Sequence, residues 1–585
     1  MPIPVCLAAG ALAAAIPTPA TLAGVPVAQL RGRGAAVPFT EYEAENGCFT
    51  GTLIGPSRAL YAIAAEASGR RAVRLDRAGQ YVEFTLAKPA NAIVVRYAVP
   101  DSADGTGSDS TLGILVGNQR IGSLPLTSRY SWFYGNFPFT NRPSDGGGHH
   151  KFDEARLLLG RVLPAGTTVR IAMGPQDNAA WYVVDLADFE LVPPPLARRP
   201  GSLSVASFGA DPSGIRESSA SFAAAIAAAR KVHWPLWIGP GTYRFDRHLT
   251  VDRVTITGAG PWYSVLRGDG VGLYGRKAPF GSTKVHLSHF AVIGDVRERN
   301  DRAKLAAVGG TLGGGSTIED LWLQHHKSGV WLDGPLSGVT IRSLRIVDNS
   351  ADGINLRRGV RGARVENVFV RNSGDDGIAL WSQGSADTDD IIAHNTVVAP
   401  ILANGIALYG GRDIRISSNV VADTLTQGGG IHLGNRFGAV PLSDTIRLTD
   451  NLLARTGSYD PNWRFGVGAL WFYALDRPIG ANIEVSNTEL VDSTLEAIQF
   501  IGKPIRSVRF SSTVIDGASN WLQLQSGGAA SFSGLQARRL DDPAYARCDT
   551  SFRLQLHEVP ARLRQPSTRL CGRLDPQLVA RRLGQ

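Results

Sequence analysis

The sequence lacks the features that would indicate a nucleic-acid-binding or a membrane protein. It contains no run of five or more basic residues, although its formal net charge is +9. The scattered basic residues therefore indicate a solvated surface and not a nucleic-acid-binding patch. No apolar stretch is long enough to cross a bilayer, so we expect no membrane anchor. Cysteine is also scarce, with four among 585 residues.

Helical patterns are rare as well, and the composition favours strands and loops. Glycine is abundant, with 67 residues, and hydrophobic residues make up 43% of the chain. This composition is typical of a β-dominated protein with many loops. A chain of this length is too long for one ordinary core, so we expect two or more domains.

The N-terminal 30 residues are predicted to be a secretory signal or a disordered segment. Residues 6–24 combine an apolar run with small residues, as in the later part of a secretory signal, although a positively charged start is missing. We therefore expect a secreted, extracellular protein.

The cysteines agree with export. Cys6 lies in the expected signal and Cys48 is left over. Cys548 and Cys571 are close enough in sequence to form a disulfide within a C-terminal extension, residues 541–585.

The chain divides at a proline-rich linker, residues 193–201. Before it, residues 38–192 contain short alternating segments separated by turn residues, which predict an antiparallel β-sandwich. After it comes one clear helix, residues 216–230, with serines that can cap it and an apolar face. The pattern then changes to short β runs, and we assign residues 202–540 to a second domain.

A short apolar motif recurs along this second domain. Its first five copies are spaced by 24 to 28 residues, and each places a glycine before an apolar pair. This period, with several short strands per unit, predicts a right-handed parallel β-helix, because a propeller blade needs about 40–50 residues. The helix would cover the open N-terminal end. The copies are SGVWLDG (328–334), DGINLRRG (352–359), DGIALWS (376–382), NGIALYGG (404–411), GGIHLGN (429–435) and EAIQFIG (496–502).

Three aspartates converge in this repeat. Equivalent positions of successive coils stack about 4.8 Å apart, so we expect Asp352 and Asp376 one above the other, with Asp375 joining them from the preceding turn. Carboxyl groups this close raise at least one pKa, so a protonated acid and an ionised base can coexist, as glycoside hydrolysis requires. An aspartate ladder bonded to turn amides, or a Ca²⁺ site, is the alternative.

Five side chains near the aligned positions are predicted to bind substrate, because aromatic rings stack on pyranose faces and polar groups bond hydroxyls. Each also has an ordinary structural interpretation, such as packing in the wall of the β-helix or a satisfied buried histidine. The five are Asn404, Trp381, Tyr409, His432 and Arg436.

Two other features receive weaker interpretations. His325 and His326 are expected to be surface or turn residues. The aromatic segment at 463–476, which contains Trp463, could form the far wall of a groove or belong to the core.

The aspartate motifs resemble the catalytic region of glycoside hydrolase family 87, the bacterial α-1,3-glucanases and mycodextranases. The matching segments are NSADGINLRRG and RNSGDDGIALWS, and the resemblance extends over roughly residues 38–540. It implies internal hydrolysis of α-1,3-linked glucan with inversion, and it makes Asp352, Asp375 and Asp376 the essential residues. We expect no cofactor to be required for catalysis.

The front domain resembles carbohydrate-binding modules of families 6 and 35. Such modules often hold a structural Ca²⁺ between an early Glu-x-Glu and a late Asp. Glu43, Glu45 and Asp188 match that placement, and their hard oxygen ligands suit Ca²⁺. Ordinary surface carboxylates are the alternative.

Polygalacturonases use a similar aspartate trio, but their next coil carries Gly-His-Gly, and Arg-Ile-Lys follows. Here the corresponding segments read NGIALYGG and DIRISSN, so the groups that serve a uronate are missing and a neutral α-glucan is favoured.

Stacked carboxyl groups lie nearer to the spacing of retaining enzymes, about 5 Å, than to the 6.5–9.5 Å of inverting ones. The spacing and the resemblance therefore disagree, although Asp375 lies off the stack and could set a longer distance.

Two other functions stay open. A polysaccharide lyase or uronide hydrolase could use the same fold, since fold alone does not settle chemistry. A lyase needs a basic residue by the acid, however, and the DDG coil shows none. The front domain and the repeat also suit a non-catalytic polysaccharide-binding protein. In each case we expect a monomer with a polysaccharide partner.

Overall fold

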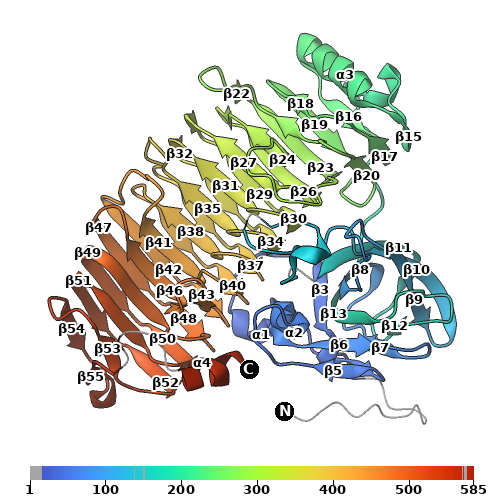
Figure 1. Ribbon diagram of the computed structural model, residues 1–585. Coiled ribbons are helices and arrows are strands. Elements are labelled where there is room, and N and C mark those ends of the chain that lie inside the picture. The colour runs from blue at the N-terminus through green and yellow to red at the C-terminus, as the bar shows by residue number, and fades with distance from the viewer. Residues whose placement is uncertain (1–15, 138, 149–151, 570, 572–575, 585) are drawn as a thin grey trace.

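The computed structural model describes residues 16–137, 139–148, 152–569, 571 and 576–584 (Figure 1). Strands dominate, and they form an antiparallel β-sandwich followed by a long parallel β-helix, which confirms the predicted fold class. The sandwich lies against one side of the β-helix (Figure 1). None of the described helices is long and apolar enough to span a bilayer.

The sandwich packs two antiparallel sheets over one apolar core. Burial alternates along strands such as β7 (Tyr81–Thr85), whose Val82 and Phe84 side chains lie in that core. The central strand β13 is buried along its whole length, because its outer side faces the β-helix. One sheet contains β11 (Asp153–Leu163), β8 (Ala90–Ala98), β13 (Tyr182–Glu190) and β3 (Phe39–Glu43); the other contains β10 (Gln119–Thr127), β9 (Asp109–Val116), β12 (Thr168–Ala172) and β7 (Tyr81–Thr85).

Residues 16–30 are folded, which differs from the predicted signal or disordered segment. They form β1 (Thr21–Leu22), β2 (Val25–Pro26) and α1 (Val27–Leu30), and β1 pairs with β3. Their apolar side chains are buried in a cluster that includes valines and leucines of the β-helix, so these side chains have a partner that the sequence does not reveal. The rest of that predicted segment lies outside the described residues.

The β-helix runs in continuous parallel pairings from β14 (Leu203–Ser204) to β55 (Pro566–Ser567). The pairings pass residue 540, the predicted end of the domain, because the chain keeps adding strands to the same stack. The six predicted repeats form one face of it, in register, together with one further strand, β46: the face contains β27 (Ser328–Asp333), β31 (Ile354–Arg357), β35 (Ile378–Trp381), β38 (Ile406–Tyr409), β41 (Ile431–Asn435), β46 (Leu470–Ala474) and β49 (Ile498–Ser511).

The repeated glycines are required by close packing. A Cβ at Gly377 would lie 2.3 Å from Cγ1 of Val397, and one at Gly353 would lie 2.5 Å from the carbonyl oxygen of Gly377. Both distances are shorter than any ordinary contact, so a side chain here would push the core and the next coil apart.

One strand of this face, β46, was not predicted as a repeat from the sequence. β46 stacks between the copies at 429–435 and 496–502. The connection before it contains an extra hairpin, β44 (Ser458–Asp460) and β45 (Phe465–Val467), which breaks the repeat spacing. The aromatic segment at 463–476 therefore belongs partly to the core and partly to the surface. Trp471 is buried in the coil, whereas Trp463 on the hairpin is exposed.

A helix covers the N-terminal end of the β-helix, and a disulfide lies near the other end. α3 (Ser219–Val232) lies over the N-terminal end and buries Phe222 and Ile226 in the core (Figure 1). Near the other end, Cys548 and Cys571 form a disulfide. Cys48 is also disulfide-bonded, so the prediction that it is left over is wrong.

Candidate active site

The structure brings Asp352, Asp375 and Asp376 together. Asp352 and Asp376 directly precede the glycines that lead into β31 and β35, and these strands pair in register. One carboxyl oxygen from each aspartate lies within 4.8 Å of the other two. Asp352 and Asp376 are 6% and 3% exposed, whereas the side chain of Asp375 is 21% exposed.

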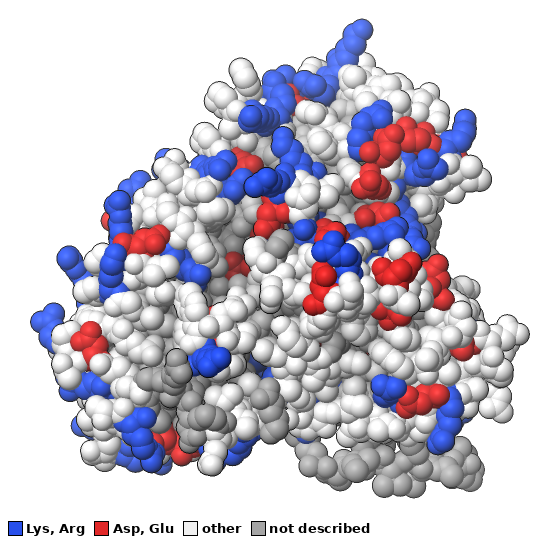
Figure 2. Space-filling model, in the orientation of Figure 1, with Lys and Arg blue, Asp and Glu red and all other residues white. Residues whose placement is uncertain are grey.

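The trio lines a groove of about 1220 Å³ on this face of the β-helix. Trp381, Tyr409, Asn404 and Arg436, which were predicted to bind substrate, also line it. On the face shown in Figure 2, basic side chains are spread along the β-helix and interspersed with acidic ones. This distribution matches the solvated surface expected from the sequence.

Burial and mutual repulsion shift the two buried carboxyl groups in the same direction. Burial raises the pKa of Asp352 well above its usual range, and the neighbouring Asp375 and Asp376 raise it further. Burial and then Asp375 raise the pKa of Asp376 to about 7, against the lowering effect of the hydrogen bonds it accepts. The buried pair therefore holds a proton near neutral pH, which a general acid needs.

Asn404 and Tyr409 hold Asp376 in place. The Tyr409 hydroxyl donates to Oδ2 of Asp376 at 2.8 Å, and the backbone and side-chain amides of Asn404 donate to Oδ1 at 2.8 and 2.9 Å. Nε1 of Trp471 donates to Oδ1 of Asn404 at 2.8 Å, which fixes the amide orientation. Asn404 is 1% exposed, and its side-chain amide is occupied by Asp376, Trp471 and the backbone amide of Gly429.

Arg299 is the main residue that sequence reasoning missed. It donates to Oδ2 of Asp375 at 2.7 Å and to Asp301 at 2.8 Å, and its guanidinium stacks on the ring of Phe137 at 4.7 Å. It comes from the connection between β23 (Val285–Ile293) and β24 (Ala306–Gly310), which lies outside the repeat, so no spacing signals it. Phe137 comes from the sandwich, which therefore contributes to the groove wall.

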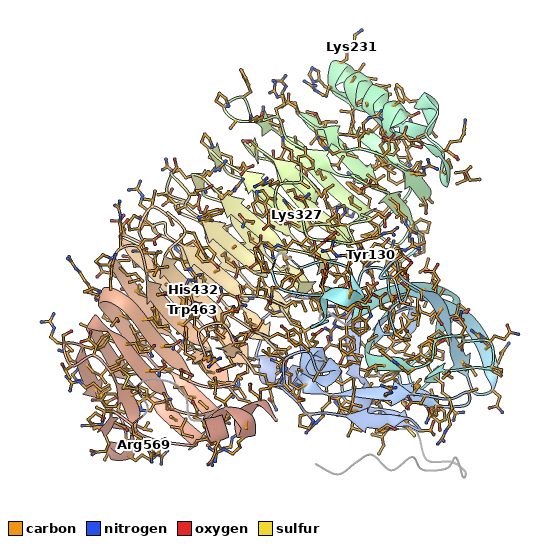
Figure 3. All side chains as sticks on the ribbon, in the orientation of Figure 1. Tyr130, Lys231, Lys327, His432, Trp463 and Arg569 are labelled. Carbon is orange, nitrogen blue, oxygen red and sulfur yellow. A yellow bond between two sulfur atoms is a disulfide. The ribbon has the colours of Figure 1, made fainter. Side chains whose placement is uncertain are left out.

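Lys327 is a second basic residue beside the trio. Its ammonium group donates to the carbonyl of Ala303 at 2.6 Å and lies over the ring of Trp331 at 5.0 Å, and both side chains line the groove. Figure 3 labels Lys327 on the β-helix. The DDG coil itself supplies no basic residue, as expected, but other segments bring two cations to the aspartates. Both cations reach the trio from segments distant from the DDG coil.

The remaining predicted substrate residues divide into two groups. Trp381 is half-buried in the groove and donates from Nε1 to the carbonyl of Phe437 at 3.3 Å, and Arg436 stacks on the Phe437 ring at 4.1 Å. His432 is fully buried beneath them, with its ring 4.1 Å from that of Trp471. The structure contradicts a substrate contact for His432, whose pKa burial lowers well below its usual range.

The sandwich anchors the segment that leads to the aspartates. Arg371, four residues before Asp375, is fully buried and donates to Glu154 at 2.5 Å, Asp188 at 2.9 Å and Glu41 at 3.0 Å, all from the sandwich. The next residue, Asn372, accepts a hydrogen bond from Arg96 of β8. Charged groups from two domains therefore fix the start of RNSGDD.

His325 and His326 lie in the turn between β26 (Thr317–Gln324) and β27, as predicted, but both are buried and neither is a surface residue. Nε2 of His325 lies 2.8 Å from Oδ1 of Asp153, and its ring stacks on Tyr130 at 3.8 Å (Figure 3). Burial lowers the pKa of His325 to about 4 and that of His326 to about 3. The sandwich covers this turn, and no local pattern in the sequence reveals that contact.

The predicted calcium ligands do not form one set. Asp188 is occupied by Arg345 and Arg371, and within the described part of the chain no group of metal-ligating side chains joins it to Glu43 and Glu45. Glu43 and Glu45 each keep a buried carboxylate oxygen without a hydrogen-bond partner. Burial raises the pKa of both, and nearby Asp185 raises it further. Asp188 is therefore not available to a cation, whereas Glu43 and Glu45 each keep one oxygen that accepts no hydrogen bond.

Comparison with family models gives two matches. Residues 36–192 match the α-1,3-glucanase catalytic domain D1, and residues 216–521 match the α-1,3-glucanase catalytic domain D2. The D1 match covers the sandwich and places it in a catalytic unit, whereas the resemblance to carbohydrate-binding modules is not shown. No curated protein sequence matches the chain.

Solved structures of similar proteins carry the same fold. The catalytic unit of a thermostable glycoside hydrolase family 87 α-1,3-glucanase from Streptomyces thermodiastaticus strain HF3-3 is 37% identical, with 90% of this chain and 96% of that chain covered and a TM-score of 0.82. The catalytic domain of Agl-KA is 25% identical, with 90% and 99% covered and a TM-score of 0.83. A family 87 α-1,3-glucanase catalytic domain in complex with nigerose is 25% identical, with 89% and 99% covered and a TM-score of 0.78.

Proposed function

Because this chain belongs to the α-1,3-glucanases of glycoside hydrolase family 87, we propose that it is a secreted enzyme that cleaves α-1,3-glucan internally, with inversion. The observation that carries the proposal is the aspartate trio, which lies in a long groove and has two buried carboxyl groups with raised pKa values.

The spacing of the trio supports this assignment. A solved family 87 α-1,3-glucanase was studied as three single aspartate-to-alanine variants, in complex with nigerose or tetrasaccharides. Those three positions are separated by 23 residues and by one residue, as are Asp352, Asp375 and Asp376 here. We infer that the trio performs the same type of chemistry in both chains.

The reaction needs one proton donor and one proton acceptor. The donor protonates the glycosidic oxygen as the bond to the anomeric carbon breaks, and the acceptor takes a proton from the water that attacks that carbon. We propose that the donor's proton comes from the buried Asp352–Asp376 pair. Asn404 and Tyr409 orient Asp376, and Arg299 orients Asp375.

Inversion rests on the family resemblance and not on the spacing. The nearest carboxyl oxygens lie within 4.8 Å, which is closer than the roughly 6.5–9.5 Å between carboxyl groups in most inverting enzymes. The anomer released first decides between the two outcomes, because inversion at an α-linkage releases a β-anomer.

Substrate and location have separate support. The groove carries the rings of Trp331, Trp381 and Phe437, which suit the faces of neutral sugar rings, so we propose α-1,3-glucan or nigeran as the polymer. Export is supported by the polymeric nature of such a substrate and by the Cys548–Cys571 disulfide, which suits an oxidising compartment.

The test measures reducing ends released from α-1,3-glucan and from nigeran, with the first anomer followed by NMR. Asp375→Asn and Asp376→Asn should each lower kcat at least about 100-fold without changing thermal unfolding. Asp389→Asn, on an exposed aspartate of the β-helix, is the matched control. Release of reducing ends from neither polymer would reject the function, and an unsaturated product absorbing in the ultraviolet would indicate a lyase. A first-formed α-anomer would reject inversion alone.

We also propose that Glu43 and Glu45 hold a structural Ca²⁺ in the sandwich. The support is their pair of buried oxygens without hydrogen-bond partners, which offer hard ligands to a cation. The ion would stabilise the sandwich and take no part in bond cleavage.

A further inference from the structure

Trp463 is exposed at the tip of an ordered hairpin. It is 54% exposed, and the hairpin of β44 and β45 that carries it is inserted between two coils of the β-helix. The carboxylate of Asp460 accepts hydrogen bonds from the backbone amides of Asn462 and Trp463 at 2.8 and 3.1 Å. The turn is therefore fixed, and it holds the indole in one place although solvent covers about half of it.

Two other rings support the indole. Trp463 stacks on Phe465, with ring centroids 5.5 Å apart and planes inclined by 17°. Tyr473 meets it edge to face at 6.3 Å. We call Trp463, Phe465 and Tyr473 the hairpin platform. None of the three carries a charge, so the platform offers an apolar flat surface rather than an ion-binding site.

The platform continues the groove of the active site. Tyr473 is in register with Gly434, Tyr409 and Trp381 on successive coils, so it lies three coils, or about 14 Å, beyond Trp381. The guanidinium of Arg436, which lines the groove, lies 5.3 Å from the Tyr473 ring. Figure 3 shows Lys327 and Trp463 well apart along the β-helix, with the hairpin residue on the C-terminal side.

A second cavity lies between the groove and the hairpin turn. A pocket of about 430 Å³ is lined by Pro461 and Asn462 of the hairpin turn, and it shares Phe137, Leu402 and Gln427 with the groove. The hairpin turn therefore borders a cavity that shares three wall residues with the groove of the aspartates.

We propose that the hairpin platform is a distal binding site for the glucan chain, occupied by long substrates and out of reach of short ones. A pyranose ring presents C–H groups on its faces, and these pack against an indole plane without needing charge. The platform would hold the polymer about three coils from the scissile bond, which favours repeated cleavage of one chain. This inference rests on the proposed glucanase function and adds where the polymer binds.

The test compares a polymer with a short substrate. Trp463→Ala should lower the ratio of kcat/KM on α-1,3-glucan to kcat/KM on an α-1,3-linked tetrasaccharide about 3- to 10-fold, the range expected for losing one ring-stacking contact. Trp463→Tyr, which keeps a flat ring, should recover most of that ratio. Trp234→Ala is the matched control, because Trp234 is 50% exposed but follows α3 at the far end of the β-helix.

A binding measurement separates this site from the chemistry. In an Asp375→Asn background, Trp463→Ala should weaken retention on insoluble α-1,3-glucan by a similar factor, with unchanged thermal unfolding. An unchanged polymer-to-tetrasaccharide ratio, or an equal loss on both substrates, would overturn the platform while leaving the glucanase function intact. Absence of hydrolysis of any α-1,3-glucan by the unaltered enzyme would instead reject the function on which the platform rests.

Discussion

Tyr409→Phe removes one hydrogen bond from the aspartate trio and little else. The Tyr409 hydroxyl donates to Oδ2 of Asp376 at 2.8 Å, and the side chain is 7% exposed. Phenylalanine keeps the ring in its packed position, so the perturbation is the loss of one donor from a buried carboxyl group. The two donors from Asn404 to Oδ1 remain.

The expected shift follows from the strength of that bond. A hydrogen bond to a charged group contributes about 1.5–3 kcal/mol, and one pKa unit corresponds to about 1.4 kcal/mol. The hydroxyl favours the ionised carboxylate, so its loss should raise the pKa of Asp376 by about 1–2 units. The pKa of Asp376 is about 7 with the bond in place, so the titration should move into the alkaline range.

The assay is the pH dependence of kcat/KM on a soluble α-1,3-linked oligosaccharide, which reports groups of the free enzyme. If Asp376 acts as the base, the acidic limb of the profile moves upward; if it acts as the acid, the alkaline limb does. Tyr243→Phe, at a buried tyrosine packed on Phe222 of α3 whose hydroxyl donates to the carbonyl of Gly239 at 3.2 Å, is the matched control and should move neither limb. A Tyr409→Phe profile with both limbs unmoved would refute the assignment of Asp376 to the chemistry.

Three further predictions concern stability. Burial raises the pKa of Glu496 from 4.5 to about 7, so this residue should destabilise the fold by up to about 3 kcal/mol as the pH rises from 4.5 past 7. Glu496→Gln should therefore raise the thermal midpoint at pH 8 but not at pH 4.5. An equal rise at both pH values would contradict this prediction. Arg371→Met should lower the free energy of unfolding, measured in urea, by about 3–5 kcal/mol, because it leaves buried carboxylates uncompensated. The control is Arg361→Met, which breaks an exposed ion pair and should lower the free energy of unfolding by less than about 1 kcal/mol. Chelation should lower the thermal midpoint of the unaltered protein and Ca²⁺ should restore it, with a smaller response in Glu43→Gln; a midpoint insensitive to chelator would reject the calcium site.

The trio could be predicted because a parallel β-helix translates its coils with little change. A position that recurs after one period in the sequence returns to the same place one coil higher, so the spacing of Asp352 and Asp376 gave their contact directly. The same argument predicted the shared face of Trp381 and Tyr409. It failed at β46, because the inserted hairpin changed the number of residues between coils.

Contacts from outside the repeat could not be predicted. Arg299 reaches Asp375 from a connection of irregular length, and Phe137 reaches Arg299 from another domain. His325 looks like an exposed turn residue, but Asp153 and Tyr130 of the docked sandwich contact it. Asp188 looked like a metal ligand, but the placement of Arg345 and Arg371 opposite it depends on how the two domains meet.

Because Asp352 stacks on Asp376, the length of the groove can change without changing the distance between these two carboxyl groups. The acid and base need only two adjacent coils, so a coil inserted elsewhere would extend the channel by about 4.8 Å without separating them. An insertion between residues 352 and 376 would instead pull the carboxyl groups apart. Proteins that share this architecture can therefore adapt to longer or differently shaped polymers by adding coils or hairpins away from this pair of coils, as the hairpin of β44 and β45 illustrates, while the pair itself stays fixed in length.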